Sequence, residues 1–434
     1  MKIINGCVLF LAVSILVNCN KSRSNLRLET QLNQLSDALD EAIVNDFFSP
    51  PVASRIYAYT HLSALYQLHQ ATPDSISPLQ LLEINPTAGD TSIANKIKIL
   101  FTSSFVAQQL VFDASPLQRF DSTLIAALEQ SHFENDEIES LYDEAKTSGT
   151  NLMKWINSDG YPQTRTAIKY TLIDADSSWQ PTPIHFMEAL EPHWGELRTI
   201  LPASIFDTIL HRPLRYDSSE GSEFQEELAL VEQQVNQLNS NDSSIARFWD
   251  CNPLVISIDG HVNSSIKQLT PGGHWMSLQR QLSKSHKFQD RIYHRALLAA
   301  TIFDSFIYCW KLKYQYQLVR PITIIRKYNN PKWESMIQTP NFPEYPSGHS
   351  VISGASSVIL ESQFGYNFSY SDSTELAYGH GIRKYASFQA AAEEAAFSRF
   401  YAGIHYKYSV LESLKIGQQI AKHYVSIRNT AHVK

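Results

Sequence analysis

Two cations, Lys313 and Arg320, stand seven residues apart at the end of a long and mostly apolar segment, and Pro321 follows them directly. On one continuous helix, two turns bring both side chains to the same face, about 10 Å apart along the axis. Pro321 then distorts or ends that helix. Two like charges on one face repel each other, and a bound anion would relieve the repulsion. A solvated Lys beside a salt-bridged Arg gives the same pattern, so the pair alone identifies no site.

A second segment with chemical potential is Pro-Ser-Gly-His at 346–349, which precedes a mostly apolar run at 351–360. The Pro predicts a tight entry into a helix, Ser347 suits the N-cap, and Gly348 allows the backbone to approach a ligand closely. The free amides of a first helical turn favour an anion. His349 is then placed to exchange a proton with that anion. A capped helix with an incidental His is the alternative.

A third segment contains Ser398-Arg399 and, after five further residues, His405. On one unbroken helix the six-residue step from Arg399 to His405 would separate the two side chains by about 120°. Gly403 lies between them and predicts a break after a helix at 385–402. The resulting elbow would let both side chains face one pocket. A surface Arg and a core His are the alternative.

In chain order these segments read Lys-x6-Arg-Pro, Pro-Ser-Gly-His and Ser-Arg-x5-His. This order and spacing resemble the superfamily of type 2 phosphatidic acid phosphatases and vanadium-dependent haloperoxidases. The sequence is most similar to the bacterial secreted branch of the haloperoxidases, from about Ser54 to about Ile420. The further similar segments are Trp310, 342–350, 401–406, 179–183, 248–250 and 273–275.

The resemblance implies an enzyme that binds vanadate and uses hydrogen peroxide to oxidise a halide, forming hypohalous acid that halogenates small organic acceptors. The groups implied to hold the oxyanion are Lys313, Arg320, Ser347, Gly348, Arg399 and His405. Among them, His405 is implied to be the vanadium ligand and Lys313 to polarise the peroxide. His349 is implied to carry protons, which completes the catalytic set. Trp310 and Phe342 match aromatic positions near the halide, and bromide or iodide is favoured because chloride is hardest to oxidise.

One position departs from the superfamily pattern, which usually has an Asp four residues after the second His. Here that position is Ser409. In the phosphatases the Asp orients and activates the His as a nucleophile, so its loss should weaken phosphoryl transfer more than vanadate binding. Glu412, two turns from His405, is a candidate substitute.

Two other functions stay open from the sequence. One is a soluble periplasmic phosphatase of the same superfamily, and the other is a non-catalytic lipoprotein that binds an oxyanion. The net charge of −7 gives no reason to expect a nucleic acid partner. Any anion site must therefore be a local cluster of cations.

The elements that position these segments are predicted to be helices. Apolar residues recur at steps of three and four, strand alternation is nearly absent, and Pro and Gly mark loops, as at 179–183 and 271–273. We therefore expect an all-α fold of helix bundles joined by long loops. The predicted helices are 31–48, 52–71, 103–112, 120–130, 135–158, 222–240, 287–316, 350–363, 385–402 and 405–428. The predicted parts are an N-terminal helical region at 31–240 and a catalytic helical region at 241–434.

The N-terminus predicts export. An apolar stretch from Cys7 to Val17 follows Lys2 and is too short to span a membrane, which is typical of a signal peptide. It ends in Leu-Val-Asn-Cys, which resembles a bacterial lipobox. We expect a signal peptide at 1–18, a lipidated Cys19 and a tether over 19–30. The resemblance then implies a periplasmic or outer-membrane-associated lipoprotein of a Gram-negative bacterium, with the lipid as its only membrane contact. The oligomeric state stays open.

Two of the four cysteines, Cys251 and Cys309, remain in the predicted fold. A chain of this size does not need a disulfide, so we expect both to be unpaired. No Cys and His spacing in the sequence is typical of zinc.

Cys19→Ser should release the protein from the membrane fraction, because acyl chains on Cys19 would be its only strong membrane contact. Cys309→Ser is the matched control and should stay with the membrane. Fractionation followed by a high-salt wash measures the difference, and a Cys19 variant that resists the wash would rule out the lipid anchor.

Overall fold

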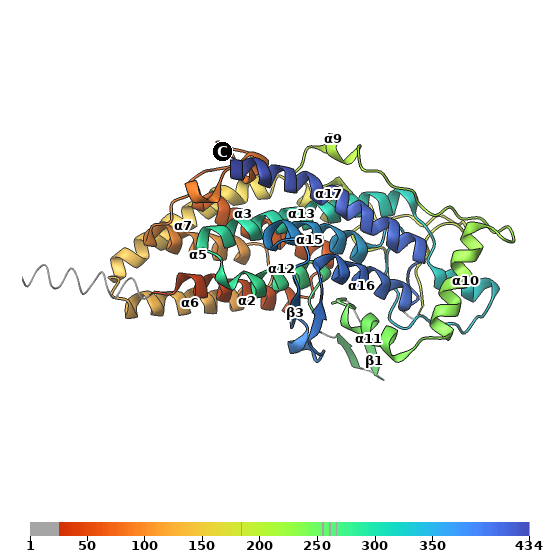
Figure 1. Ribbon diagram of the computed structural model, residues 1–434. Coiled ribbons are helices and arrows are strands. Elements are labelled where there is room, and N and C mark those ends of the chain that lie inside the picture. The colour runs from red at the N-terminus through yellow and green to blue at the C-terminus, as the bar shows by residue number, and fades with distance from the viewer. Residues whose placement is uncertain (1–25, 184, 254–255, 260–261, 266, 434) are drawn as a thin grey trace, which may run out of the picture.

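The computed structural model describes residues 26–183, 185–253, 256–259, 262–265 and 267–433. The expected signal peptide, Cys19 and most of the expected tether lie outside these ranges. Helices dominate, which confirms the all-α prediction (Figure 1). Among the described residues, no helix is long and apolar enough to cross a membrane.

Over residues 28–248, helices run one after another, with short connections up to residue 166 and longer segments at 167–202 and 207–222. They are α2 (Leu28–Asn45), α3 (Pro50–Leu68), α4 (Pro78–Leu82), α5 (Ile93–Gln108), α6 (Ser115–Gln130), α7 (Asn135–Ile156), α8 (Tyr161–Thr166), α9 (Ala203–Phe206), α10 (Glu223–Asn236) and α11 (Ser240–Phe248). Short 3₁₀ helices are η1 (Pro86–Ala88) and η2 (Trp194–Glu196).

The second half contains longer helices and two small hairpins. The helices are α12 (Pro271–Leu282), η3 (Ser283–Ser285), α13 (Phe288–Tyr316), α14 (Pro321–Tyr328), α15 (Gly348–Phe364), η4 (Leu376–Tyr378), α16 (Phe388–Tyr401) and α17 (Lys407–Val433). The antiparallel hairpins pair β1 (Ile256–Asp259) with β2 (Val262–Ser265) and β3 (Tyr370–Asp372) with β4 (Arg383–Tyr385). The sequence did not predict these hairpins, because strands of three or four residues are too short for an alternating pattern to stand out.

The loop predicted at 271–273 is wrong, since these residues form the first turn of α12. Thr270 caps the helix by accepting a hydrogen bond from the Gly273 amide at 3.1 Å. Pro at the first helical position lacks only an N–H that would be unpaired there anyway. The same residues that interrupt a helix therefore start this one.

The prediction that Lys313 and Arg320 share one helix is also wrong. Gln317 adopts a left-handed conformation, with φ 53°, and ends α13 between the two cations. Arg320 is the N-cap of α14, and Pro321 starts that helix instead of ending the preceding one. The two side chains therefore approach the site from a helix end and from a helix start.

The core is built around α3 and α13, which are buried on nearly every face. Every residue of α3 is buried, as is the stretch of α13 from Arg291 to Trp310. A helix that is buried on nearly every face must be enclosed by other parts of the protein. Here α13 packs on α3, α12, α15 and α17, and α15 packs on α16 and α17 (Figure 1). The ends of α13, α15 and α16 carry the residues singled out above.

Helices α15 and α17 approach so closely that glycine is required at their contact. A Cβ built on Gly417 of α17 would lie 1.9 Å from the carbonyl oxygen of Val351, and one on Gly354 of α15 would lie 2.3 Å from that of Leu414. Both neighbours are backbone atoms, which cannot move aside as a flexible side chain can. The position of α15, and hence of Ser347 and His349 at its start, depends on this contact.

Gly417→Ala should lower the free energy of unfolding by about 1–3 kcal/mol, because the added methyl group forces the two helices apart. Gly381→Ala is the control, since a Cβ there meets no atom within 4 Å, and a surface change of this kind usually stays within about 0.5 kcal/mol. Chemical denaturation of both variants measures the difference. Equal stability of the two variants would contradict the close packing.

Candidate active site

Lys313 lies in the last turn of α13 and is fully buried. Its Nζ donates hydrogen bonds to the carbonyl oxygens of Pro343, at 2.9 Å, and Glu344, at 3.1 Å, and to that of Pro346. Burial lowers the pKa of Lys313 to about 7, and the nearby Arg320 acts in the same direction. The amine is thus stabilised by carbonyl dipoles at a position where water cannot solvate its charge.

Arg320 is fully buried between α14 and the loop that precedes α15. Its Nε donates to the carbonyl oxygen of Phe342 at 3.0 Å, and one terminal nitrogen, Nη1, donates to that of Ile404 at 2.7 Å. The same Nη1 lies 3.1 Å from Nε2 of His405. The other terminal nitrogen, Nη2, is buried and has no partner among the described residues.

Ser347 caps α15, as the sequence predicted. Its Oγ accepts from the amide of Ser350 at 3.4 Å and from the hydroxyl of Ser350 at 3.0 Å. Because both contacts use the oxygen as acceptor, the Ser347 hydroxyl hydrogen remains able to donate. Gly348 is the first helical residue, so its amide belongs to the unpaired first turn of the helix. A Cβ built on Gly348 would contact the ring of Trp310 at 3.5 Å.

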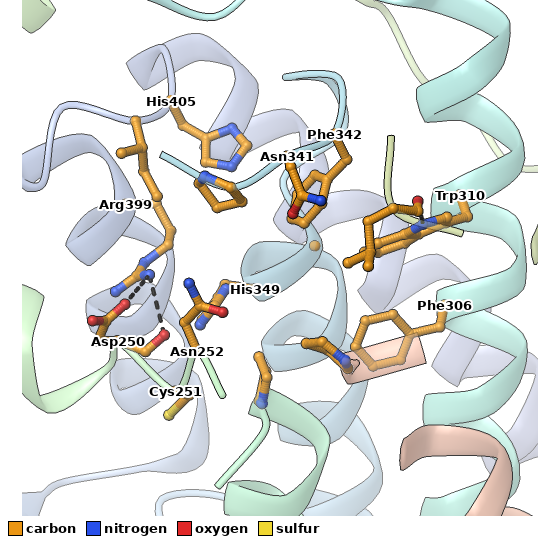
Figure 2. Close-up of a pocket in the computed structure, with 16 residues that line it drawn as sticks. Asp250, Cys251, Asn252, Phe306, Trp310, Asn341, Phe342, His349, Arg399 and His405 are labelled. Carbon is orange, nitrogen blue, oxygen red and sulfur yellow. Dashed lines mark hydrogen bonds and ion pairs between the residues drawn. The ribbon is translucent and has the colours of Figure 1, made fainter. Parts of the chain in front are cut away.

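His349 is half-buried at the wall of a pocket formed by α13, α15, α16 and the loop at 249–252 (Figure 2). Its ring forms hydrogen bonds to the backbone of Asp250 and Trp249. Its Nε2 has no partner among the described residues. Burial and the neighbouring Arg399 lower the pKa of His349 well below 6.5, so the imidazole is neutral.

Arg399 enters the pocket from the last turn of α16 and is buried. Its guanidinium donates to the carbonyl oxygens of Ala246 at 3.1 Å and Asp250 at 3.4 Å, and lies 3.6 Å from the Asp250 carboxylate (Figure 2). Burial lowers the pKa of Arg399, although Asp250 opposes the change. Asp250 therefore balances this cation, a role that the sequence did not reveal.

His405 follows the break at Gly403, where φ is 78°, and precedes α17, as the predicted elbow required. Its Nδ1 lies 2.7 Å from a carboxylate oxygen of Glu344, so Nδ1–H donates there and the unprotonated Nε2 accepts from Nη1 of Arg320. Burial, followed by Arg320 and Lys313, lowers the pKa of His405 well below 6.5. The neutral ring thus presents Nε2 toward Arg320 and the pocket.

The carboxylate that orients His405 comes from Glu344, which corrects the expectation for Glu412. Glu412 instead pairs with Lys415. Glu344 is fully buried and also accepts from the amide of Tyr406 at 3.1 Å and from the hydroxyl of Ser409 at 2.9 Å. Burial raises the pKa of Glu344 to about 7, opposed by Arg320 and Ser409. Glu344 therefore fills the orienting role that the usual Asp would have at position 409. The Ser at 409 is thus not by itself evidence against phosphoryl transfer.

Trp310 and Phe342 form an aromatic wall of the same pocket. Their ring centroids lie 5.0 Å apart, and Phe306 extends the wall with its centroid 5.5 Å from that of Trp310. Nζ of Lys313 lies 4.8 Å from the Phe342 ring centroid, at the distance of a cation–π contact. The wall is thus apolar on its surface and electropositive behind it.

The structure brings the predicted residues together in two layers. Trp310, Phe342, Gly348, His349, Arg399 and His405 line the pocket itself. Three further predicted residues lie behind this lining. Lys313 contacts Phe342, Arg320 contacts His405, and Ser347, next to Gly348, contacts Ser350. Sequence reasoning missed Glu344 and Asp250, although both stood in segments that it singled out.

The residues present fit a small oxyanion. Three buried cations face one buried carboxylate, Glu344, and one half-buried carboxylate, Asp250, so the charge of the site is not balanced by protein groups alone. The unpartnered Nη2 of Arg320, the Ser347 hydroxyl and the first-turn amides of α15 are donors that an anion would satisfy. Nε2 of His405 offers an unprotonated nitrogen to a metal oxide.

Comparisons with known proteins identify the fold and its family. A crystal structure titled as the first bacterial vanadium-dependent iodoperoxidase matches with 32% sequence identity and a TM-score of 0.80, over 92% of this chain and 96% of that one. The chain belongs to the vanadium-dependent haloperoxidases. The family description "VCPO second helical-bundle domain" matches residues 294–432, which contain all the predicted cofactor-binding residues of this haloperoxidase.

More distant structures share the fold of this haloperoxidase. Holo and apo forms of a bacterial vanadium-dependent chloroperoxidase match with TM-scores of 0.63 and with 13% and 14% identity. The holo form is covered over 92% of its length and 91% of this chain, and the apo form over 93% and 87%. A comparison with curated protein sequences found no match.

Glu344→Gln should weaken vanadate binding by about 10- to 100-fold, because a neutral amide makes the His405 ring less basic and orients it less firmly. Glu412→Gln is the matched control and should bind vanadate as the wild type does, since Glu412 pairs with Lys415. Titration of the vanadate-free protein by calorimetry measures both affinities. Weaker vanadate binding in the Glu412 variant, with unchanged binding in the Glu344 variant, would instead mean that Glu412 orients His405.

Proposed function

We propose that this haloperoxidase oxidises iodide, and bromide less readily, with hydrogen peroxide, and that the pocket described above is its vanadate site. The observation that carries the proposal is the neutral His405, whose Nε2 faces three buried cations while Glu344 holds Nδ1–H. Vanadate, when bound, supplies a Lewis-acid centre that activates hydrogen peroxide toward attack by a halide ion.

The groups proposed to hold vanadate divide by their chemistry. His405 is the proposed vanadium ligand through Nε2. The proposed charged donors are Lys313, Arg320 and Arg399, and the proposed neutral donors are the Ser347 hydroxyl and the Gly348 amide. Guanidinium groups add directional, paired hydrogen bonds to oxyanion oxygens, which a single ammonium group cannot supply.

His349 is the proposed proton carrier. The contacts of its ring with the backbone of Asp250 and Trp249 leave Nε2 unpaired in a neutral imidazole. That nitrogen can accept a proton from hydrogen peroxide as it binds and return it when hypohalous acid leaves. Lys313 is proposed to polarise the peroxide through its charge, from behind Phe342, since its Nζ donates to three carbonyl oxygens.

The aromatic wall supports a large and polarisable halide. Trp310 and Phe342 present ring faces and edges to the pocket, with Lys313 behind them. The iodoperoxidase is 32% identical to this chain, whereas the chloroperoxidase is 13% identical. Iodide also gives up electrons more easily than bromide or chloride, so a site of modest oxidising power acts on it first. Small organic acceptors would then react with the released hypohalous acid.

We further propose that the enzyme is exported and anchored by lipid on Cys19, in the periplasm or on the outer membrane of a Gram-negative bacterium. The apolar run from Cys7 to Val17 and the Leu-Val-Asn-Cys sequence support this proposal. Reactive hypohalous acid would then form outside the cytoplasm.

The experiment that tests the function uses purified, vanadate-free protein. Hydrogen peroxide and each halide are supplied with and without vanadate, and phosphate-ester hydrolysis is measured in parallel. We expect halide oxidation that requires vanadate and is fastest with iodide. Rapid phosphate-ester hydrolysis without halide oxidation at saturating vanadate would overturn the proposal.

Substitution of the two histidines should have different effects on vanadate binding and on turnover. His405→Ala should lose tightly held vanadate, because it removes the proposed ligand. His349→Ala should keep most of the binding but lose about 10²- to 10⁴-fold in turnover, the usual contribution of a general acid–base group. His423→Ala, on α17 and outside the pocket lining, is the control for both measurements. Equal loss of vanadate in the His349 and His405 variants would mean that the roles are not divided in this way.

A further inference from the structure

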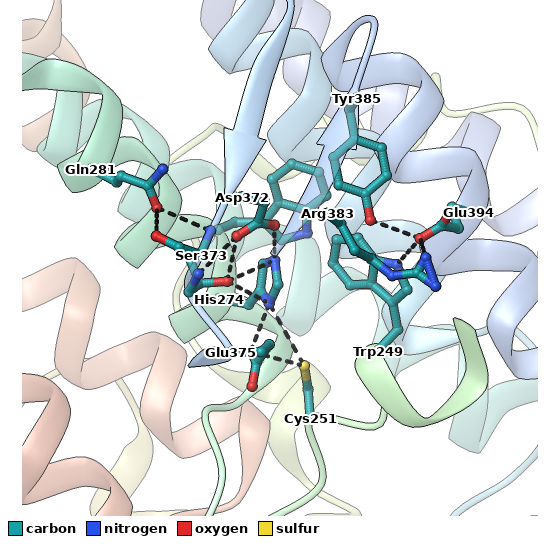
Figure 3. Close-up of polar contacts among 12 residues, drawn as sticks. Trp249, Cys251, His274, Gln281, Asp372, Ser373, Glu375, Arg383, Tyr385 and Glu394 are labelled. Carbon is teal, nitrogen blue, oxygen red and sulfur yellow. Dashed lines mark hydrogen bonds and ion pairs between the residues drawn. The ribbon is translucent and has the colours of Figure 1, made fainter. Parts of the chain in front are cut away.

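A second cluster of reactive side chains lies at the loop at 249–252, and one of its members, Cys251, also lines the pocket. Its members are Cys251 from that loop, His274 from α12, and Glu375, the residue before η4 (Figure 3). Their exposed fractions are 3%, 0% and 2%, so all three are enclosed by protein. A loop, helix α12 and the segment between β3 and η4 therefore meet at one point. The proposed haloperoxidase mechanism gives these three residues no role.

The three potential ligand atoms form a compact triangle. Sγ of Cys251 lies 4.0 Å from Nδ1 of His274 and 3.8 Å from Oε1 of Glu375, and the nitrogen and oxygen are 2.7 Å apart. A point equidistant from the three atoms lies about 2.1 Å from each. Zinc binds nitrogen and oxygen ligands at about 2.0–2.2 Å and thiolate sulfur at about 2.3 Å. An ion thus fits between these atoms with shifts of a few tenths of an ångström.

A carboxylate on the far side of His274 fixes the orientation of the ring. Nε2 lies 2.9 Å from Oδ2 of Asp372, and the other oxygen of Asp372 accepts from the amide and hydroxyl of Thr374 at 2.9 and 2.7 Å. A histidine that binds a metal through one nitrogen usually donates its other N–H to a carboxylate in this way. Nδ1 is therefore directed at Cys251 and Glu375.

We propose that Cys251, His274 and Glu375 bind one divalent metal ion of the zinc type, with a water molecule in the fourth position. Thiolate, imidazole and carboxylate together suit zinc rather than calcium or magnesium, which prefer oxygen ligands. Binding releases two protons, one from the Cys251 thiol and one from Nδ1 of His274, while Glu375 binds through its carboxylate. No oxidation or reduction is involved.

Without a metal ion, protons on the His274 ring and on the Cys251 thiol take its place between these side chains. Burial disfavours a charged His274, but the carboxylates of Asp372 and Glu375 outweigh it and raise the pKa of the ring well above 6.5. Burial raises the pKa of the Cys251 thiol to about 12. The competing arrangement is therefore an imidazolium between two carboxylates beside a neutral thiol, and metal analysis distinguishes it from the ion.

The proposed ion would act as a structural link and not as a catalyst. Cys251 has a left-handed backbone, with φ 39°, and directly follows Asp250, which contacts Arg399. The Trp249 ring packs on His274 with centroids 4.4 Å apart. A metal bound at Cys251 would fasten the loop that supplies Asp250 to Arg399 and backbone hydrogen-bond partners to His349.

Metal analysis of the untagged full chain, expressed with added zinc and purified without chelators, tests the proposal. We expect one zinc per chain in the wild type, loss of zinc in Cys251→Ser, and one zinc in Cys309→Ser. Cys309 is the matched control because it is also a buried, free cysteine, but its Sγ faces the carbonyl of Pro346. A folded wild type without stoichiometric zinc, or loss of zinc in the Cys309 variant, would overturn the site.

Cobalt substitution provides a second measurement of metal binding, which does not depend on enzyme activity. Protein expressed in cobalt-supplemented medium should show thiolate-to-cobalt absorption in the near ultraviolet, which Cys251→Ser abolishes and Cys309→Ser retains. If Cys251→Ser does not fold, the wild-type zinc content and cobalt spectrum still decide the question. Vanadate is quantified separately, so failure of this site and failure of the proposed function give different results.

Discussion

The structure depends on how it accommodates three cations in a helical core. Lys313, Arg320 and Arg399 are each at most 1% exposed, and moving an unpaired charge out of water costs several kcal/mol. Backbone carbonyls supply most of the compensation, from Pro343, Glu344 and Pro346 around the lysine and from Phe342, Ile404 and Ala246 around the arginines. Carbonyls are free for such bonds in loops and at helix ends, because those inside a helix are already paired. The site therefore has to lie where helices begin and end.

The same constraint explains the position of the carboxylate that orients His405. A carboxylate on α17 would leave the loop at 343–346 with only neutral groups beside Lys313 and Arg320. Placed at Glu344, it contacts His405, the Tyr406 amide and Ser409, and it lies close enough to both cations to be stabilised by them. One buried charge thus serves the histidine and the cations together, and the position four residues after His405 can be a small hydroxyl residue.

Much of this could be predicted from the sequence, since local rules govern it. The Ser347 cap, the Gly403 break and most helices follow from propensity, capping and apolar periodicity. The predicted helix at 287–316 ends where α13 does, but the place of Arg320 at the start of the next helix was missed, because nothing marks Gln317 as a residue that adopts a left-handed backbone. Glu344 was part of a segment already singled out, but its partner lies 61 residues away. Cys251 and His274 are 23 residues apart, and Glu375 lies a further 101 residues along the chain, so no zinc-like spacing is visible.

The loop at 249–252 joins two buried polar systems that would otherwise be independent. Toward the pocket, Asp250 balances Arg399, and the backbone of Trp249 and Asp250 contacts His349. On its other side, the Trp249 ring and Cys251, which also lines the pocket, contact His274, and Asp372 and Glu375 hold His274 on either side. Because both systems depend on residues of this one short loop, a shift that relaxes one side must disturb the other. The loop whose backbone contacts the His349 ring is thus also held by the contacts of Cys251 and Trp249 with His274.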